Sequence, residues 1–405
     1  MRNVNHARSN ESHEVFTARI ERIASNGEGI LTHNGQKFFV DATAPLDSVT
    51  VRVKEPHKGW GTAELLCIEE PSPFRTPCAC PLAGRCGGCS LQHLAYEKQI
   101  EEKAAILRES FVRIGGFKEP PAVRIRRSKC FGYRNRVQFH RFKSSLPGFK
   151  VKRSDEIIQV SACPVADEGI NNALAEKKIA PPVEKDRWTV YSHKDAFLME
   201  GKNGRGSVVF LDKRLMLDAG VFFQSNASAL ETLIKDVVSI AEEAGSSDSA
   251  PPLAADVYCG VGTFAAFLRD VDCFESIELV EENKAALSLA RVNVNAAGGG
   301  RGVCGTCHAV SADAWAKGNR NRYGFIIADP PREGLSQGVR TWLCAQGATQ
   351  NAPVFAYVSC NPATLARDSA ALVKSGYALS SLAFYDFYPH TPHIESVAVF
   401  HRSRV

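Results

Sequence analysis

The chain has 405 residues, of which 44% are hydrophobic and 23% are charged. This composition is typical of a globular protein, and the length allows two or three domains. The net charge of +5 identifies no partner, so a nucleic-acid site would have to be a local basic patch. No apolar run reaches the roughly 20 residues of a membrane span, and residues 1–14 lack the apolar core of a signal peptide. We therefore expect a cytoplasmic protein, in which the 13 cysteines are metal ligands, catalytic or buried rather than disulfide-bonded.

Residues 14–69 alternate apolar and polar positions and contain two hairpin signals, Asn26-Gly27 and Asn34-Gly35. This pattern predicts a small five-stranded, OB-like β-barrel, a fold that often binds RNA, with a purely structural barrel as the alternative. Residues 70–215 are expected to form a β-rich central domain. Within it, residues 96–114 carry the apolar stripe of a helix that could pack on the following domain.

From residue 216 to residue 405 the pattern changes to alternating strands and helices, which predicts an α/β domain. The predicted strands lie near 254–258, 276–280, 324–328 and 353–358, with two closing strands at 381–387 and 394–401. Open α/β sheets bind their ligands at the carboxyl ends of the strands. The residues that follow these strands are therefore the first candidates for a functional site.

The segment 256–264 predicts a strand, a glycine-rich turn and the start of a helix, which together suit a nucleotide-like cofactor. Glu281 ends the next strand, 25 positions after Asp256, where a carboxylate can bind ribose hydroxyls. The chain has no Gly-x-Gly-x-x-Gly fingerprint at this position, which disfavours NAD. S-adenosylmethionine (AdoMet) is the better match.

Ser359-Cys360-Asn361-Pro362 follows a predicted strand, so Cys360 is expected at the same edge of the sheet. A thiolate beside an AdoMet site has a specific use, because its addition to carbon 6 of uracil makes carbon 5 nucleophilic enough to accept a methyl group. A base must then remove the carbon 5 proton. We choose Glu395, at the start of the last strand, over His390 and His393. Asp329 ends another strand and could accept the N3–H of uracil.

Two other cysteine patterns bear on these interpretations. Cys259 lies inside the glycine-rich segment and is the rival nucleophile, but there it would face the cofactor rather than a base. Cys304 and Cys307 form a second pair that no further cysteine or histidine pair completes, so we interpret it as incidental.

Three cysteines fall within ten residues at Cys80, Cys86 and Cys89, and Cys163 could supply a fourth ligand. The intervening Gly87-Gly88 lets the backbone fold tightly, so that the thiolates can converge. Four thiolates suit either zinc or an iron–sulfur cluster, and the spacing does not decide between them. Cys78 is close in sequence and is a possible false ligand.

These segments resemble the RNA uracil-5-methyltransferases, in the branch with a TRAM domain and an iron–sulfur cluster. The resemblance covers nearly the whole chain. It is carried by residues 80–93 with Cys163, Gly132-Tyr133-Arg134-Asn135, residues 222–226, residues 256–264, Asp329-Pro330, residues 359–362 and His393-Ile394-Glu395.

The resemblance implies a class I (Rossmann-like) AdoMet methyltransferase domain at 216–405, an OB-like TRAM barrel at 14–69 and a central domain at 70–215 that carries the cluster. It implies a 4Fe–4S cluster, which we expect to be structural, held by Cys80, Cys86, Cys89 and Cys163. It implies AdoMet contacts from Gln224, Tyr258, Glu281 and Asp329. It also implies Cys360 as nucleophile, Glu395 as base and Phe222 as the aromatic residue that packs on the target base.

Members of this branch usually act on 23S rRNA, so we expect that substrate, with uridine 54 of tRNA as the alternative. Two other functional classes are disfavoured. A non-catalytic RNA-binding or redox protein would need neither Cys360 nor Glu395, and an AdoMet-dependent N-methyltransferase site is disfavoured because Arg332 follows Pro331. We expect a monomer with no membrane partner, whose first RNA contacts are Arg126, Arg127 and Arg134.

Overall fold

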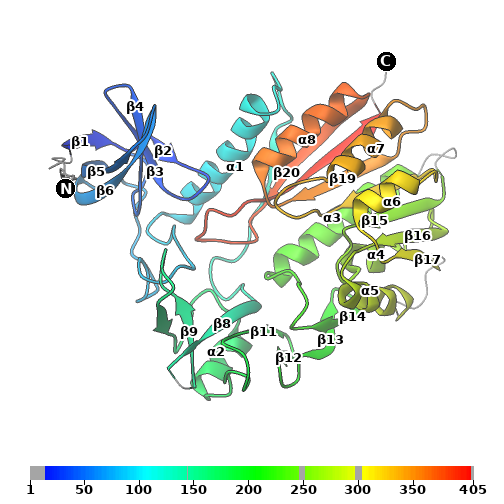
Figure 1. Ribbon diagram of the computed structural model, residues 1–405, viewed down its shortest axis with the longest axis horizontal. Coiled ribbons are helices and arrows are strands. Elements are labelled where there is room, and N and C mark those ends of the chain that lie inside the picture. Colours follow the sequence, from blue (N-terminus) through cyan, green and yellow to red (C-terminus); the bar gives the residue numbers. More distant parts are fainter. Residues whose placement is uncertain (1–13, 144, 246–250, 297–302, 403–405) are drawn as a thin grey trace, which may run out of the picture.

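The computed structural model places a β-barrel at one end of the molecule, a smaller β-rich unit below and a large mixed sheet with helices at the other end (Figure 1). The structure describes residues 14–143, 145–245, 251–296 and 303–402. No helix among these residues is long and apolar enough to cross a membrane.

The N-terminal barrel is built from six strands in the order β1-β5-β6-β4-β3-β2. They are β1 (Val15–Arg19), β2 (Arg22–Ile23), β3 (Gly29–His33), β4 (Gln36–Val40), β5 (Ser48–Pro56) and β6 (Trp60–Glu70). The two edge strands, β1 and β2, are halves of one bent segment, so pairing of β1 with β5 and of β2 with β3 closes the sheet. The predicted barrel is therefore present, with the first of its five predicted strands divided into two. Asn34 and Gly35 both have positive φ, at +49° and +77°, as the predicted hairpin turn requires.

The central sheet has the order β10-β9-β8-β11-β12, and a separate hairpin, β13-β14, follows it. Its elements are β8 (Arg136–Phe142), β9 (Leu146–Lys150), β10 (Ile157–Gln159), α2 (Glu168–Ala175), β11 (Arg187–His193), β12 (Ala196–Met199), β13 (Arg205–Phe210) and β14 (Lys213–Asp218). Phe139 and Trp188 pack against Ile170 of α2 in a core of its own. The cysteine-rich segment is fastened to this sheet, because the Gly87 amide donates to the Lys150 carbonyl at 3.0 Å.

The C-terminal sheet has eight strands in the order β17-β16-β15-β18-β19-β21-β20-β7. The strands are β7 (Val123–Arg126), β15 (Leu253–Val257), β16 (Ser276–Val280), β17 (Val303–His308), β18 (Phe325–Ala328), β19 (Val354–Ser359), β20 (Tyr377–Tyr385) and β21 (Glu395–Arg402). The first five in this order run parallel, and β21 is antiparallel to both of its neighbours. All six predicted strands are present. β7 and β17 were not predicted.

Helices cover both faces of this sheet (Figure 1). They are α1 (Tyr96–Arg113), α3 (Ala227–Gly245), α4 (Thr263–Leu268), α5 (Lys284–Ala296), α6 (Ala312–Gly318), α7 (Gln337–Gly347) and α8 (Pro362–Lys374). Successive strand residues alternate between two cores, so Ala254 packs on the α3–α5 side and Ala255 on the side of α1 and α6–α8. The result is the doubly wound α/β domain that the sequence predicts.

Helix α1 and strand β7 come before the central sheet in the chain but lie with the C-terminal sheet. β7 pairs in parallel with β20, and Leu107 of α1 is buried in the same core as Tyr357 of β19. A buried ion pair fastens α1 to the loop between β20 and β21, with Lys103 Nζ 2.7 Å from Asp386 Oδ1. That loop leads directly into Glu395, so α1 supports the edge of the sheet where the candidate site lies.

Candidate active site

The predicted catalytic and cofactor residues meet at one edge of the C-terminal sheet. Tyr258, Glu281, Asp329 and Cys360 each follow directly after one of four parallel strands, namely β15, β16, β18 and β19. Glu395 begins the antiparallel strand β21, so its first residue lies at this same edge. Ser359 pairs with Ser396, and one further step in the antiparallel register sets Cys360 opposite Glu395.

The glycine-rich turn after β15 is tied to the acid after β16. Tyr258, Gly260 and Gly262 have φ values of +63°, +55° and +74°, so the backbone turns sharply at three points. The Gly260 amide donates to Glu281 Oε2 at 3.0 Å, and the Asn283 amide donates to Glu281 Oε1 at 2.8 Å. A Cβ on Gly262 would lie 2.9 Å from Ala290, so glycine allows α5 to approach the turn. The turn and carboxylate form the cradle expected of a nucleotide-like cofactor.

The loop after β18 joins this cradle to the cysteine side of the site. Gln224 donates a hydrogen bond to Asp329, while Gln224 Oε1 is buried without a partner among the described residues. Burial raises the pKa of Asp329 to about 6, although the hydrogen bond from Gln224 opposes the shift. The Tyr258 hydroxyl contacts Ser336 Oγ at 3.1 Å at the far end of the same loop. Ser336 was not predicted, because a lone serine has no distinguishing pattern.

Cys360 lies at the junction of β19 and α8, where Asn361 caps the helix and Pro362 is its first residue. Asn361 Oδ1 accepts the Ala363 amide at 3.0 Å, and Asn361 Nδ2 donates to the Arg332 carbonyl at 2.9 Å. The cap therefore fixes both the helix start and the loop that follows Asp329.

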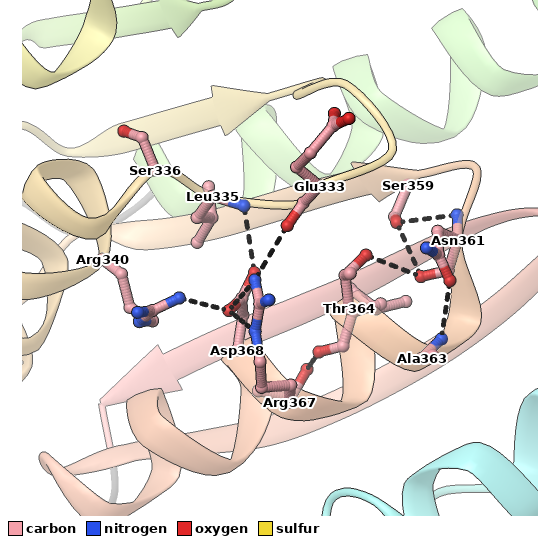
Figure 2. Close-up of polar contacts among 12 residues, drawn as sticks. Glu333, Leu335, Ser336, Arg340, Ser359, Asn361, Ala363, Thr364, Arg367 and Asp368 are labelled. Carbon is pink, nitrogen blue, oxygen red and sulfur yellow. Dashed lines mark hydrogen bonds and ion pairs between the residues drawn. The ribbon is translucent and has the colours of Figure 1, made fainter.

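A buried carboxylate about two turns further along α8 holds the same loop (Figure 2). Asp368 Oδ2 accepts the Leu335 amide at 3.0 Å, and Asp368 Oδ1 accepts from Arg340 at 2.9 Å and from Arg367. Its side chain is fully buried, so the surrounding donors offset the cost of removing its charge from water. Hydrogen bonds therefore hold both the start of α8 and the loop after Asp329, next to Cys360.

The Cys360 thiol and the Glu395 carboxyl both have pKa values that their surroundings raise. Burial, followed by the nearby charges of Glu395 and Asp329, raises the pKa of Cys360 to about 11. Arg332 is the opposing cation. Burial and the charge of Asp329 raise the pKa of Glu395 well above its usual range, and Glu395 Oε1 has no hydrogen-bond partner among the described residues. Groups with such shifted pKa values at a sheet edge are characteristic of catalytic sites.

The two histidines considered as bases differ in their surroundings. The amide of buried His390 donates to Gln99 Oε1 at 2.8 Å, and its Nδ1 lies 3.1 Å from Gln99 Nε2. His390 therefore fastens the loop to α1. His393 is exposed, and its ring lies edge-on to Tyr388 with the centroids 5.7 Å apart. Tyr388 shares a hydrogen bond with Ser225 and lies in the field of Glu395, a position that the sequence did not predict for it.

The four predicted cysteine ligands line one cavity. This cavity of about 260 Å³ is lined by Cys80, Cys86, Cys89, Cys163, Gln92 and Arg134, among others. Cys78 is exposed and is not among the residues that line it. Burial raises the pKa of Cys89 to about 12. Within the described part of the chain, no three cysteine, histidine or acidic side chains converge closely enough to hold a single metal ion.

The predicted RNA-contacting arginines are not equally free. Arg126 donates two hydrogen bonds of 2.8 Å to Asp236, and Arg127 forms an ion pair of 2.9 Å with Glu97. The Arg134 amide donates to the Val165 carbonyl, and Arg134 lines the cysteine cavity while its charge acts on Tyr388, near Glu395. Of the three predicted arginines, only Arg134 therefore lies near the reacting groups and has no carboxylate partner among the described residues.

Comparisons with known proteins identify related families. The sequence model of a family described as tRNA (Uracil-5-)-methyltransferase matches residues 318–403, and that of a methyltransferase small domain matches residues 247–345. An uncharacterized RNA methyltransferase of Treponema denticola is 30% identical over 396 residues, which cover 91% of this chain and 95% of that protein. The 23S rRNA (uracil(1939)-C(5))-methyltransferase RlmD of Pseudomonas fluorescens strain Pf0-1 is 28% identical, with 95% and 91% covered.

A solved structure shares the fold over nearly the whole length. It is the Pyrococcus abyssi tRNA (uracil-54, C5)-methyltransferase in complex with S-adenosyl-L-homocysteine, with a TM-score of 0.71 and 24% identity. The similarity covers 95% of this chain and 100% of that one.

Proposed function

Because this chain belongs to the RNA uracil-5-methyltransferase family, we propose that it uses AdoMet to methylate carbon 5 of a specific uridine in 23S rRNA. The observation that supports the chemistry most directly is the register of β19 and β21, which sets Cys360 opposite Glu395 beside Asp329. Family membership identifies an enzyme, so a non-catalytic binding or redox protein is no longer an alternative. The competing substrate is uridine 54 of tRNA, on which the Pyrococcus abyssi enzyme acts.

In this proposal AdoMet supplies the methyl group, and this chain provides its binding site. Glu281 at the glycine-rich turn would hold the ribose hydroxyls. Gln224, Tyr258 and Asp329 would complete the site, because Gln224 and Asp329 are joined by a hydrogen bond and Tyr258 borders the same loop. The cluster of carboxylates at this edge favours a cationic ligand over a neutral one, which suits a sulfonium that loses its charge when the methyl group leaves.

The proposed reaction uses Cys360 and Glu395 in turn. The Cys360 thiol, which is only partly buried, loses its proton to water, and its sulfur bonds to carbon 6, so that carbon 5 becomes an enolate carbon. Carbon 5 takes the methyl group from the sulfonium, which becomes a neutral thioether. Glu395 then accepts the carbon 5 proton, the carbon 6–sulfur bond breaks, and Cys360 leaves as a thiolate.

We further propose that the cysteine cavity holds a 4Fe–4S cluster. A cluster is wider than a single ion, so its four ligands surround a cavity rather than converge on one point. Burial raises the pKa values of Cys86, Cys89 and Cys163, so these thiols would lose their protons only beside a strong positive charge such as iron. Four cysteines leave no open iron position, and methyl transfer needs no electron, so we assign the cluster a structural role.

This assignment predicts the iron content of two matched variants. Protein purified without oxygen should contain about four irons per chain. Cys163→Ser should lose iron and lower the unfolding temperature, because a cluster stabilises the segments that its ligands join. Cys78→Ser, a change of the same kind at an exposed cysteine outside the cavity, should alter neither property. Stoichiometric zinc without iron in the anaerobic protein would contradict the cluster.

The substrate is tested by methylation of unmodified transcripts. Purified protein with labelled AdoMet should form 5-methyluridine in a 23S rRNA fragment, at one or a few positions that sequencing can map. A tRNA transcript in a parallel reaction should stay unmodified. Labelling of tRNA uridine 54 with none in the rRNA would establish the alternative substrate, and heat-treated protein controls for nonenzymatic transfer.

A further inference from the structure

Arg136 has an unusual position among the arginines near the site. It begins β8, and its guanidinium Cζ lies 5.7 Å from the ring centroid of Phe222. Its Nε is buried without a hydrogen-bond partner, and no ion pair of this guanidinium is found in the described part of the chain. Glu200 is the carboxylate whose charge acts on Arg136, but it already accepts hydrogen bonds from Lys185 and from the Thr189 amide.

Three arginines from the same part of the chain show how a guanidinium is paired here, whereas Arg134, like Arg136, has no carboxylate partner among the described residues. Arg126 pairs with Asp236, Arg127 pairs with Glu97, and Arg141 pairs with Asp186 at 3.0 Å. An arginine stays charged at any physiological pH. Partial burial of that charge without an anion is costly, so its presence indicates that an anion is supplied from outside the chain.

The surroundings of Arg136 indicate which anion this is. Phe222 is 64% exposed and lies two residues before Gln224, the hydrogen-bond partner of Asp329. Tyr388, the residue beside Glu395, is also in the electrostatic field of Arg136. A guanidinium that faces an exposed aromatic ring, two residues from Gln224, combines the two groups that single-stranded RNA requires: a stacking surface and a cation.

We propose that Arg136 binds a backbone phosphate of the RNA next to the uridine that is methylated, while Phe222 stacks on a base. The proposal rests on the proposed function, because it requires an RNA substrate. The phosphodiester is the occupant because it carries the compensating charge, which the uncharged edges of a base do not. Arg136 therefore contacts the substrate but not the reacting atoms.

The test measures RNA affinity at several salt concentrations. Arg136→Met removes the charge and keeps most of the aliphatic bulk, Arg136→Lys keeps the charge, and Arg187→Met is the matched control. Arg187 is exposed on β11 of the same sheet. In the strand register it lies opposite His140, toward the end of β8 that is remote from Arg136. Loss of one phosphate contact should lower the slope of log affinity against log salt by about 0.7 in Arg136→Met. Arg136→Lys should keep most of the slope, and Arg187→Met should keep all of it.

Two further measurements separate the possible outcomes. AdoMet affinity should be unchanged in Arg136→Met, which shows that the fold and the cofactor site are intact. An unchanged salt slope in Arg136→Met would overturn the proposal, and if turnover also fell, Arg136 would act only by orienting Phe222. Methylation of the same RNA by the unaltered protein tests the proposed function separately, because RNA binding and its salt slope are measured without turnover.

Discussion

Cys360→Ala is expected to abolish methylation while AdoMet affinity stays nearly unchanged. Carbon 5 of uracil is too weak a nucleophile to accept a methyl group until a thiolate has added to carbon 6. Removal of a catalytic nucleophile typically costs at least ~10⁴-fold in rate. In the strand order β15-β18-β19, the glycine-rich turn follows β15 and Cys360 follows β19, so the strand that leads to Asp329 lies between them. Loss of the Cys360 thiol should therefore leave cofactor binding intact.

Single-turnover methylation and AdoMet titration of two cysteine variants make this test specific. Cys259→Ala is the matched control, because Cys259 is buried in the cofactor turn and was the rival nucleophile. Cys259→Ala should retain methyl transfer, with any loss confined to AdoMet affinity. Substantial turnover by Cys360→Ala, or loss of the chemical step only in Cys259→Ala, would contradict the assigned nucleophile.

The same assignment predicts how the covalent step depends on pH. RNA containing 5-fluorouridine should trap an adduct with Cys360, because no proton can leave carbon 5. Since burial and the adjacent carboxylates raise the pKa of Cys360 to about 11, little thiolate exists at neutral pH. The rate of adduct formation should therefore rise with pH from 7 to ~9, where thiols of ordinary pKa would approach saturation.

Four residues of the site could be predicted from the sequence because each follows directly after a recognisable strand, namely Tyr258, Glu281, Asp329 and Cys360. Buried parallel strands are short apolar runs, and the residue after each one must lie at the carboxyl edge. Asp329 and Cys360 were placed in this way, and the register of β18 with β19 brings their strands together. The local sequence pattern alone does not predict that Cys360 lies opposite Glu395. This pairing depends on β21 running antiparallel to β19, which only the fold determines.

The features that were not predicted have physical reasons of two kinds. Strand β17 has the sequence Val-Cys-Gly-Thr-Cys-His, and strand β7 is Val-Arg-Ile-Arg, so neither is an apolar run. β7 joins a sheet whose other strands lie more than 100 residues later, and only tertiary contacts reveal such pairing. The ion pairs of Arg126 and Arg127 also join residues that are far apart in the sequence. A group of basic residues in the sequence therefore predicts more unpaired arginines than the structure contains in its described part.

Glu395→Gln is expected to transfer the methyl group but to release the product slowly. The amide cannot accept the carbon 5 proton, so the elimination that breaks the carbon 6–sulfur bond should slow by about 10²–10⁴-fold. A methylated protein–RNA adduct should then accumulate and survive on a denaturing gel. Glutamine has nearly the same shape as glutamate, and Glu395 Oε1 has no hydrogen-bond partner among the described residues, so the fold should tolerate the change.

The pH dependence of release distinguishes a base from a positioning group. Burial and the charge of Asp329 raise the pKa of Glu395, and only its ionised form can accept a proton. Release by the unaltered protein should therefore accelerate as pH rises until Glu395 is ionised, and Glu395→Gln should lack this rise. Glu281→Gln is the matched control, because it should weaken AdoMet binding, lower the yield of methylated adduct and leave release from that adduct unchanged. If Glu395→Gln forms no adduct at all, the carboxylate acts before methyl transfer, and the exposed His393 becomes the candidate base.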